Sequence, residues 1–134
     1  MAEGMKRRFP GYSACLAMMR KHDPQTQEDG FYLLLPRAAE FIEELVEEFG
    51  REQDHGLRCW LLELIGQARS PKAFVVLREQ LSSPDEALRG WAIRGLQRMG
   101  TSEARRALFE AGIHDGESQA PSRTSTPARR SPST

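Results

Sequence analysis

Hydrophobic residues recur along most of the chain at intervals of three and four, the spacing that places them on one face of an α-helix. The first such face lies between Pro10 and His22 and contains Tyr12, Cys15, Leu16 and Met19. The next helix is expected to begin at Asp23-Pro24, because aspartate caps a helix and proline suits its first position. Gly30 is a weak point in this helix, whose apolar residues are Phe31, Leu34 and Leu35.

Pro36 is expected to end that helix and to open another, which extends to Phe49 or Gly50. The apolar side of this helix consists of Ile42, Leu45, Val46 and Phe49. Its polar side consists of Glu40, Glu43, Glu44, Glu47 and Glu48. Such a division predicts a helix that packs one side on a core and leaves the glutamates in water.

From Asp54 onward the pattern repeats after 31 residues without a gap. The paired positions are Asp54 and Asp85, Leu57 and Leu88, Arg58 and Arg89, Trp60 and Trp91, Ile65 and Leu96, Ala73 and Ala104, and Leu77 and Leu108. A fixed period of roughly 20–50 residues is typical of stacked repeats. Each unit is predicted to be a helix pair: Asp54–Ala68 with Pro71–Leu81, then Asp85–Met99 with Ser102–Ala111.

The run LRCWLLELIGQARSPKAFVVL, residues 57–77, resembles the HEAT-like repeat found in phycobilin lyases and many bacterial helical proteins. The residues that fit the family pattern are Leu57, Arg58, Leu61, Ile65, Gly66, Ser70, Pro71 and Ala73, with Ser70 in place of aspartate. The second unit fits at Leu88, Arg89, Ala92, Leu96, Gly100 and Ala104, but has Gln97 where glycine is usual. Residues 36–46 resemble the tail of an earlier unit, and the residues before Pro36 are assigned only as extra helices that cap the stack.

This resemblance implies an all-α fold, a short right-handed α-solenoid of antiparallel helix pairs with about seven helices. The predicted repeat domain spans residues 10–112, with clear repeats at 54–84 and 85–112. Residues 1–9 are predicted to be a flexible N-terminus. Residues 113–134 are rich in Ser, Thr, Pro and Arg and have few apolar side chains, a composition that predicts a disordered tail.

The composition limits the cellular compartment and the kinds of partner that we expect for this protein. Nineteen Lys and Arg balance nineteen Asp and Glu, so no overall field selects nucleic acid or anionic lipid. The charges are nevertheless unevenly spread: residues 36–66 hold eight acidic and three basic residues, and residues 67–112 hold five acidic and eight basic. No apolar run reaches the ~20 residues of a membrane span, and the two separated cysteines indicate free thiols. We therefore expect a cytoplasmic protein without a membrane partner.

The repeated polar residues have a structural interpretation and a functional one. Asp54 and Asp85 are expected to cap their helices, with Arg58 and Arg89 one turn further on and within reach of those aspartates. Trp60 and Trp91 are expected to stand one above the other. If their edge faces the concave side they form an aromatic anchor for a partner, and if it faces the next repeat they fill the seam between units.

Two charged sets are further candidates for partner binding. The first is the acidic helix side, in particular Glu43, Glu44, Glu47 and Glu48, which is either a solvated face or a docking surface for a basic partner. The second is an arginine set that could contact anions or nucleic acid, although Glu86, Glu103 and Glu110 interrupt it. It comprises Arg89, Arg94, Arg98, Arg105 and Arg106.

The sequence does not predict catalysis, a cofactor or a metal site. His22, His55 and His114 have no nucleophile or carboxylate partner at a suggestive spacing, and there is no CxxC or Cys/His cluster. HEAT-like metal hydroxylases bind iron through His-Glu pairs, and this sequence has no His-Glu dipeptide.

We therefore interpret the chain as a non-catalytic binding module or adaptor, monomeric on its own, that holds another protein. In a more specific form of this interpretation, the protein resembles some bacterial immunity proteins, which neutralise a toxin by covering its basic active-site region. The alternatives are a lyase-like enzyme subunit or cofactor chaperone on the same scaffold, and a weak nucleic-acid binder that uses the arginine set. The first surface to test is formed by Trp60, Trp91, Arg58 and Arg89.

Overall fold

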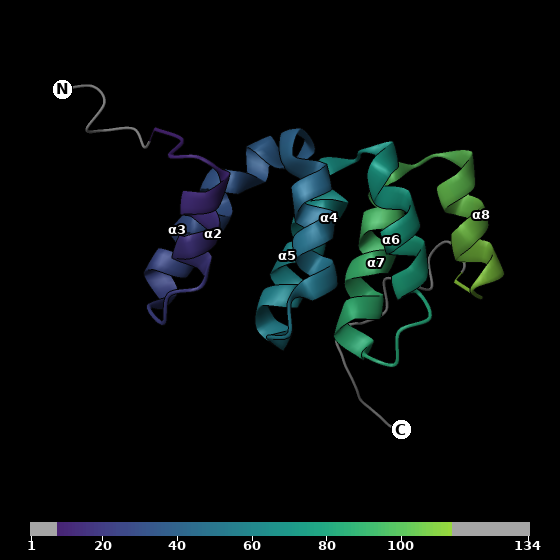
Figure 1. Cartoon of the computed structure of the whole chain (residues 1–134). Coiled ribbons are helices and arrows are strands. Elements are labelled where there is room, and N and C mark those ends of the chain that lie inside the picture. Colours follow the sequence, from purple (N-terminus) through teal and green to yellow (C-terminus); the bar gives the residue numbers. More distant parts are fainter. Residues whose placement is uncertain (1–7, 114–134) are drawn as a thin grey trace.

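The structure is a computed structural model that describes residues 8–113, and this part of the chain is helical with no strand. The predicted all-α fold is confirmed. The bounds of its helices are α2 (Tyr12–Met19), α3 (Pro24–Leu34), the 3-10 segment η1 (Leu35–Phe41), α4 (Ile42–Arg51), α5 (His55–Ala68), the 3-10 turn η2 (Pro71–Ala73), α6 (Phe74–Gln80), α7 (Glu86–Met99) and α8 (Ser102–Glu110). Figure 1 shows the helices side by side in chain order, with α2 against α3, α4 beside α5, α6 beside α7, and α8 at the far end.

Three aspartates spaced 31 residues apart start the first helix of each pair. The carboxylates of Asp23, Asp54 and Asp85 each accept the backbone N–H three residues further on, at 2.9, 2.9 and 3.1 Å. Such a bond satisfies one of the N–H groups that a helix start leaves without a partner. The two predicted caps are confirmed, and Asp23 caps α3 in the same way, one period earlier. On this spacing we number α3 with α4 as the first unit, α5 with α6 as the second and α7 with α8 as the third, and α2 precedes them.

The second helix of the first unit begins later than predicted. Residues Leu35–Phe41 form a 3-10 segment, and the α-helix starts only at Ile42. Pro36 has no N–H to donate and its ring crowds the preceding turn, so the α-helical bonding of α3 cannot run through it. In the later units Ser70 and Thr101 open the second helix instead, by accepting the N–H groups of Lys72 and Ala104.

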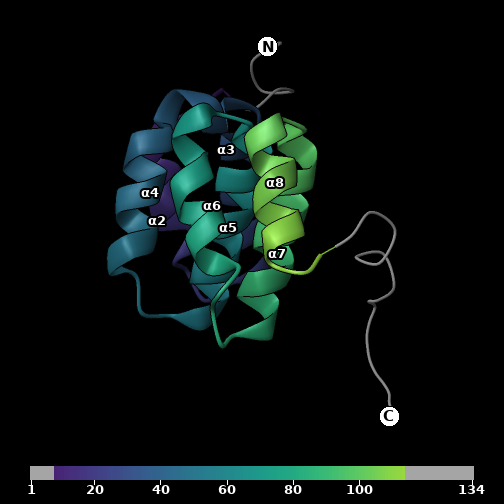
Figure 2. The same ribbon diagram turned by 90° about the vertical axis from the view of Figure 1, so that its right-hand side faces the viewer.

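The first and second helices of the units form two layers. The helices α3, α5 and α7 follow one another in one layer, and α4, α6 and α8 form the other (Figures 1 and 2). Helix α2 packs against α3 at the N-terminal end of the stack. In the first layer, the rings of Phe31 and Trp60 lie 5.2 Å apart between α3 and α5.

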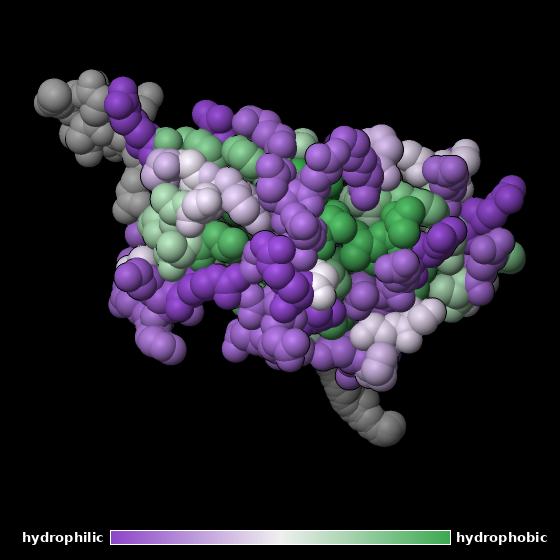
Figure 3. All heavy atoms as spheres, viewed as in Figure 1, coloured by the Kyte–Doolittle hydropathy of each residue, from purple (hydrophilic) through white to green (hydrophobic). Residues whose placement is uncertain are grey.

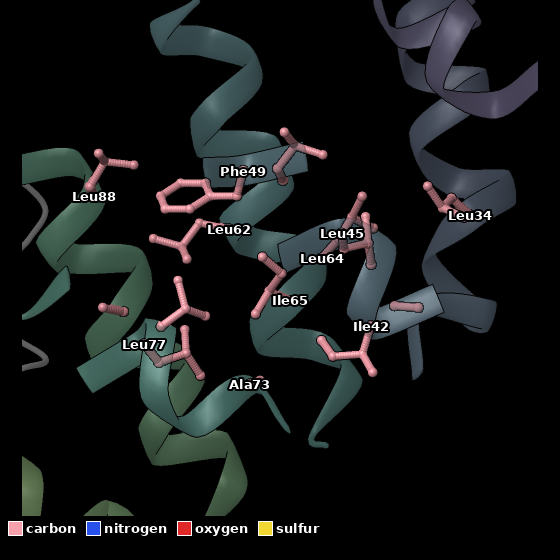
Figure 4. Packing of buried hydrophobic residues seen from close by; sticks show 14 of the residues in the cluster. Leu34, Ile42, Leu45, Phe49, Leu62, Leu64, Ile65, Ala73, Leu77 and Leu88 are labelled. Atoms are coloured by element: carbon pink, nitrogen blue, oxygen red, sulfur yellow. The ribbon is translucent and has the colours of Figure 1, made fainter. Parts of the chain in front are cut away.

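The core lies between the two layers and runs through all three units. Figure 4 shows side chains of α4, α5 and α6 filling the space between the ribbons. Side chains that are fully buried include Leu34, Leu45, Leu61, Leu62, Leu64, Ile65, Leu77 and Leu96. Burying one such side chain stabilises the fold by about 1.5–3 kcal/mol, so the stack depends mainly on contacts between neighbouring units.

Glycines allow two close helix contacts. A Cβ on Gly66 of α5 would lie 3.0 Å from the Cα of Gly95 on α7, so both residues must lack a side chain for the helices to approach this closely. A Cβ on Gly30 of α3 would lie 2.6 Å from the carbonyl oxygen of Cys15 on α2. Gly30, expected from its helix propensity to be a weak point of α3, is also the residue on which α2 packs.

Most of the predicted flexible N-terminus (1–9) and disordered tail (113–134) lies outside the described residues. At their inner edges two residues are packed. The ring of Phe9 lies 5.8 Å from that of Phe41, and the N–H of Ile113 bonds to the carbonyl of Leu108 at 2.8 Å. Among the described helices, none is long and apolar enough to cross a membrane.

Candidate functional site

A cleft opens where the turn between α2 and α3 meets the start of α5. Both segments lie at the same end of the helices, which brings residues from two units together (Figure 1). The cleft has a volume of about 500 Å³ and is open to solvent. Its lining residues are Met19, Arg20, Lys21, His22, Gln27, Glu52, Asp54, Gly56, Leu57 and Trp60.

The apolar part of the cleft is held in place by the core. Met19 and Leu57 are buried, and Trp60 is half-buried with its ring tilted against Phe31. Because Phe31 fixes the indole from behind, the exposed part of Trp60 forms a rigid apolar wall of the cleft. Of the two tryptophans considered in the sequence, this one therefore combines the two proposed roles, packing between units and facing an open surface.

The polar wall is formed by Arg20 and Glu52, which belong to an ion-pair network of covered carboxylates and exposed guanidinium groups. The guanidinium of Arg20 on α2 pairs with Glu48 and, at 2.7 Å, with Glu52. Arg51 donates to the other oxygen of Glu48 at 2.8 Å. Burial acts to raise the pKa of Glu52, but the backbone N–H of Asp54 and the charge of Arg20 outweigh it, so the pKa is lowered. This network ties the α2–α3 turn to the end of α4.

Glu48 does not lie on the solvated side of α4, where the sequence pattern placed it. It is 6% exposed, because Arg20 from α2 covers it. The prediction of Glu48 as a partner-binding residue on an acidic surface is therefore wrong. Glu43, Glu44 and Glu47 are exposed as predicted, and Glu43 pairs with Lys72 at 2.5 Å.

The two repeated arginines bond to backbone carbonyls of the preceding segments. Arg58 donates to the carbonyls of Phe49 and Glu52, at 3.0 and 3.2 Å, and its guanidinium lies 4.1 Å from the centre of the Phe49 ring. Arg89 donates to the carbonyl of Ser83 at 2.8 Å. Where a contact with Asp54 and Asp85 was expected, both guanidinium groups bond instead to backbone carbonyls that precede the helix, which satisfies these acceptors.

Trp91 has different surroundings from Trp60. It is half-buried against the core, and Arg94 lies 4.8 Å from the centre of its ring. Within the described part of the chain, the ring contact of Trp60 is with Phe31 and that of Trp91 is with Arg94, so the expected pairing of the two indoles is not formed. Trp91 is also not among the residues that line the cleft.

The arginine set is divided between the two layers. Arg94 and Arg98 lie on α7 near Glu63 of α5, whose pKa is raised by burial although both arginines act to lower it. Arg105 and Arg106 lie on α8, and Arg105 donates to the carbonyl of Gly100 at 2.7 Å. These arginines therefore do not form one continuous basic face.

His55 forms a junction between two units that the sequence analysis missed. Its Nε2 lies 2.7 Å from Asp85 of the next unit and 3.8 Å from the sulfur of Cys59. Both contacts use the same ring nitrogen, whereas a base that is oriented by a carboxylate uses one nitrogen for each partner. Burial raises the pKa of the Cys59 thiol, helped by the charge of Asp85, which opposes formation of a nucleophilic thiolate. The arrangement suits a contact between units better than nucleophilic catalysis.

Sequence reasoning also missed the α2–α3 turn as part of the site. Arg20, Lys21 and His22 were assigned only to the end of a capping helix. The signal that could have identified them is the 31-residue spacing of Asp23, Asp54 and Asp85, which places the turn in the same position as the loops before α5 and α7.

The comparisons with known proteins agree with the architecture. A family model described as HEAT repeats matches residues 42–120, more than half of the chain. Comparison with curated proteins and with solved structures gave no significant match. The matched span contains α4 to α8, and with them the two units that the sequence pattern identified. The chain therefore belongs to the HEAT-repeat family.

Proposed function

We propose that this protein is a non-catalytic binding module that holds a segment of a partner protein in the cleft between α2–α3 and α5. HEAT repeats generally mediate protein–protein interaction. The single observation that supports the site is the position of Trp60, which faces a cleft of about 500 Å³ and is backed by Phe31. A rigid tryptophan in a concave site is typical of residues that dominate binding energy.

The lining defines the chemistry of the segment. Met19, Leu57 and Trp60 offer an apolar wall, so the segment carries an apolar side chain as its anchor. The carboxylate of Glu52 is already paired with Arg20, and that of Asp54 caps α5. The exposed ammonium of Lys21 on the rim therefore favours an acidic residue beside the anchor.

The test is to block the cleft with one side chain. Gly56 lines it, and a Cβ there meets only the Asp54 carboxylate at the ordinary distance of 3.5 Å, so Gly56→Trp fills the cleft without disturbing the backbone. The matched control is Ala87→Trp, at the equivalent exposed position 31 residues later. We expect affinity capture from the native host to recover a partner with the wild type and with Ala87→Trp, but not with Gly56→Trp.

Circular dichroism of each variant establishes that the fold is intact. A second variant, Lys21→Glu, reverses the charge of the rim and should weaken capture of the same partner at least several-fold. Capture that Gly56→Trp leaves unchanged would overturn the proposed site. A chromophore or stoichiometric metal in the purified protein would instead favour the cofactor-chaperone alternative.

An immunity-type role is the narrower version of this proposal. It requires the captured partner to be a toxin, and it uses the same variants. Co-expression of the partner with the wild type should then rescue growth, whereas co-expression with Gly56→Trp should not. Rescue by both would place the protective contact outside the cleft.

A further inference from the structure

The layer formed by α4, α6 and α8 has an outer face whose chemistry changes from one helix to the next. Residues at the first, fourth, fifth and eighth positions of a helical stretch lie on one side. On the side facing away from the core, α4 carries Glu43, Glu44 and Glu47, and Glu40 precedes them on η1. The 31-residue period places Pro71, Phe74, Val75 and Arg78 at the same positions on η2 and α6. On α8 the same positions hold Ser102, Arg105, Arg106 and Phe109.

The central helix exposes the apolar part of this face. Val75 is 52% exposed, and Phe74 beside it is half-buried. Figure 3 shows hydrophobic surface over α6 with hydrophilic side chains on both sides of it. On the last helix Phe109 is 67% exposed beside Arg105 and Arg106. The face therefore runs from acidic through apolar to basic with an aromatic edge, and Glu79 and Glu110 lie on its flank.

We propose that this face binds the same face of a second copy of the chain, with a twofold axis running along α6. A symmetric interface uses one patch on both subunits, so the patch must complement itself. Rotation about an axis along α6 places α6 on its own copy, joining Val75 to Val75. It also brings Arg78, which lies over the Phe74 ring, beside its own copy, and the opposite charges of α4 and α8 must outweigh this like-charge contact. It also places the acidic α4 of each protomer over the basic α8 of the other. An axis across the helices would instead oppose α4 to α4 and bring the glutamates together.

The size of the face sets the strength of the contact. Three helices about 15 Å long and about 9 Å apart cover on the order of 400 Å² per protomer. A stable dimer buries about 800 Å² per partner, so this interface is weak and transient. The protein is therefore a monomer when dilute, as its sequence suggested, and associates when concentrated. Because opposite charges carry much of the complementarity, added salt weakens the association.

The test uses two charge-reversal variants. Neither should dimerise with itself, but each should dimerise with the other. The first variant, Glu44→Arg with Glu47→Arg, makes both α4 and α8 basic. The second, Arg105→Glu with Arg106→Glu, makes both acidic. In sedimentation velocity from low-micromolar to near-millimolar concentration, we expect the wild type to show reversible, salt-sensitive dimerisation. Each variant alone should remain monomeric, and an equimolar mixture of the two should dimerise again.

Recovery of dimerisation in the mixture distinguishes the proposed pairing of α4 with α8 from simpler explanations. Variants that had only unfolded would not recover association when mixed, and a purely apolar contact would not be lost in either variant. The control is Glu28→Arg with Glu86→Arg, which makes the same change in net charge as the first variant at exposed positions on the other layer and should dimerise as the wild type does. A wild type that stays monomeric throughout, or a mixture that stays monomeric, overturns the proposal.

The self-association is independent of the cleft. Neither pair of reversed residues lines the cleft, so both variants should still capture the partner. Gly56→Trp, in turn, should dimerise like the wild type. If either the cleft proposal or the dimer proposal fails, the other is unaffected, and the two sets of variants show which one has failed.

Discussion

Arg69 adopts a backbone conformation that a residue with a side chain rarely takes. It ends α5 with φ of 55°, in the left-handed region, whereas the equivalent position 31 residues later is Gly100, with φ of 64°. A side chain in that region costs about 1 kcal/mol, because Cβ crowds the following carbonyl. We expect Arg69→Gly to raise the free energy of unfolding by roughly 0.5–1 kcal/mol, measured by urea denaturation.

Two further substitutions isolate the cause. Arg69→Ala removes the charge and keeps Cβ, so it should give no such gain. Gly100→Ala should lose about 1 kcal/mol, because it introduces the same strain at the end of α7. A gain from Arg69→Ala equal to that from Arg69→Gly would show that the charge, and not the backbone, is responsible.

For single residues, the sequence predicts burial well where it depends on the residue's own helix. It predicts burial poorly where a side chain from another helix covers the residue. Ile42, Leu45 and Phe49 are buried as the spacing predicted. Glu48 is buried against the prediction, because Arg20 reaches it from a helix 28 residues earlier. Helical spacing describes only the helix on which a residue lies, so it contains no information about a covering side chain from elsewhere.

At the scale of the helix pair, contact between α2 and α3 depends on Gly30. A Cβ at this position would lie 2.6 Å from the carbonyl of Cys15 and 2.8 Å from the Cβ of Met18, both too close and neither free to move away. We expect Gly30→Ala to lower the free energy of unfolding by about 1–3 kcal/mol, by separating the two helices. Loss of the α2 contact should also open the cleft to which Met19 and Arg20 contribute, and so weaken partner capture.

Gly50→Ala is the matched control for this prediction. Gly50 lies in α4, and nothing comes within 4 Å of a Cβ built there. The higher helix propensity of alanine should then stabilise the protein by up to about 1 kcal/mol. Equal effects of the two substitutions in thermal unfolding would contradict the close contact at Gly30.

The helices themselves were largely predictable from local chemistry. The starts of α3, α5 and α7 follow from Asp23, Asp54 and Asp85, since a capping side chain acts on the next few residues. The 3-10 segment from Leu35 to Phe41 was not predicted. Proline marks where an α-helix must be interrupted, but whether the chain then forms 3-10 turns or a new α-helix depends on how the following residues pack.

At the scale of the whole molecule, the 31-residue period was enough to predict a stack of helix pairs, and the confirmed HEAT-repeat family agrees with it. The cleft was not predictable in the same way. It is formed by the α2–α3 turn of one unit and the start of α5 in the next, and its walls are joined by the pairing of Arg20 with Glu52. The 31-residue period predicts only the features that the units have in common. A cleft at the end of the stack depends on features of the first unit that the later units lack.

The contact between the second and third units also predicts how stability depends on pH. Burial acts to raise the pKa of Asp85, but the backbone N–H of Leu88 and the charge of His55 outweigh it, so its pKa in the folded protein lies below the ordinary value of 3.8. A carboxyl group with a lower pKa in the folded state binds its proton less tightly there than in the unfolded chain. Its stabilisation is therefore complete above the unfolded pKa of about 4 and is lost as the pH falls through the folded value.

Asp85→Asn isolates this contribution, because asparagine still caps α7 but carries no charge for His55. We expect the variant to be less stable than the wild type by up to about 1 kcal/mol at pH 5–6, because solvent screens the attraction in a partly exposed ion pair. The difference should shrink as the pH falls below about 4 and disappear once the pH lies below the lowered folded-state pKa of Asp85, where the group is protonated in both states. Urea denaturation across this range measures both free energies of unfolding. A difference that stays constant with pH would mean that Asp85 stabilises the stack through its cap alone, and that the junction with His55 adds nothing between the units.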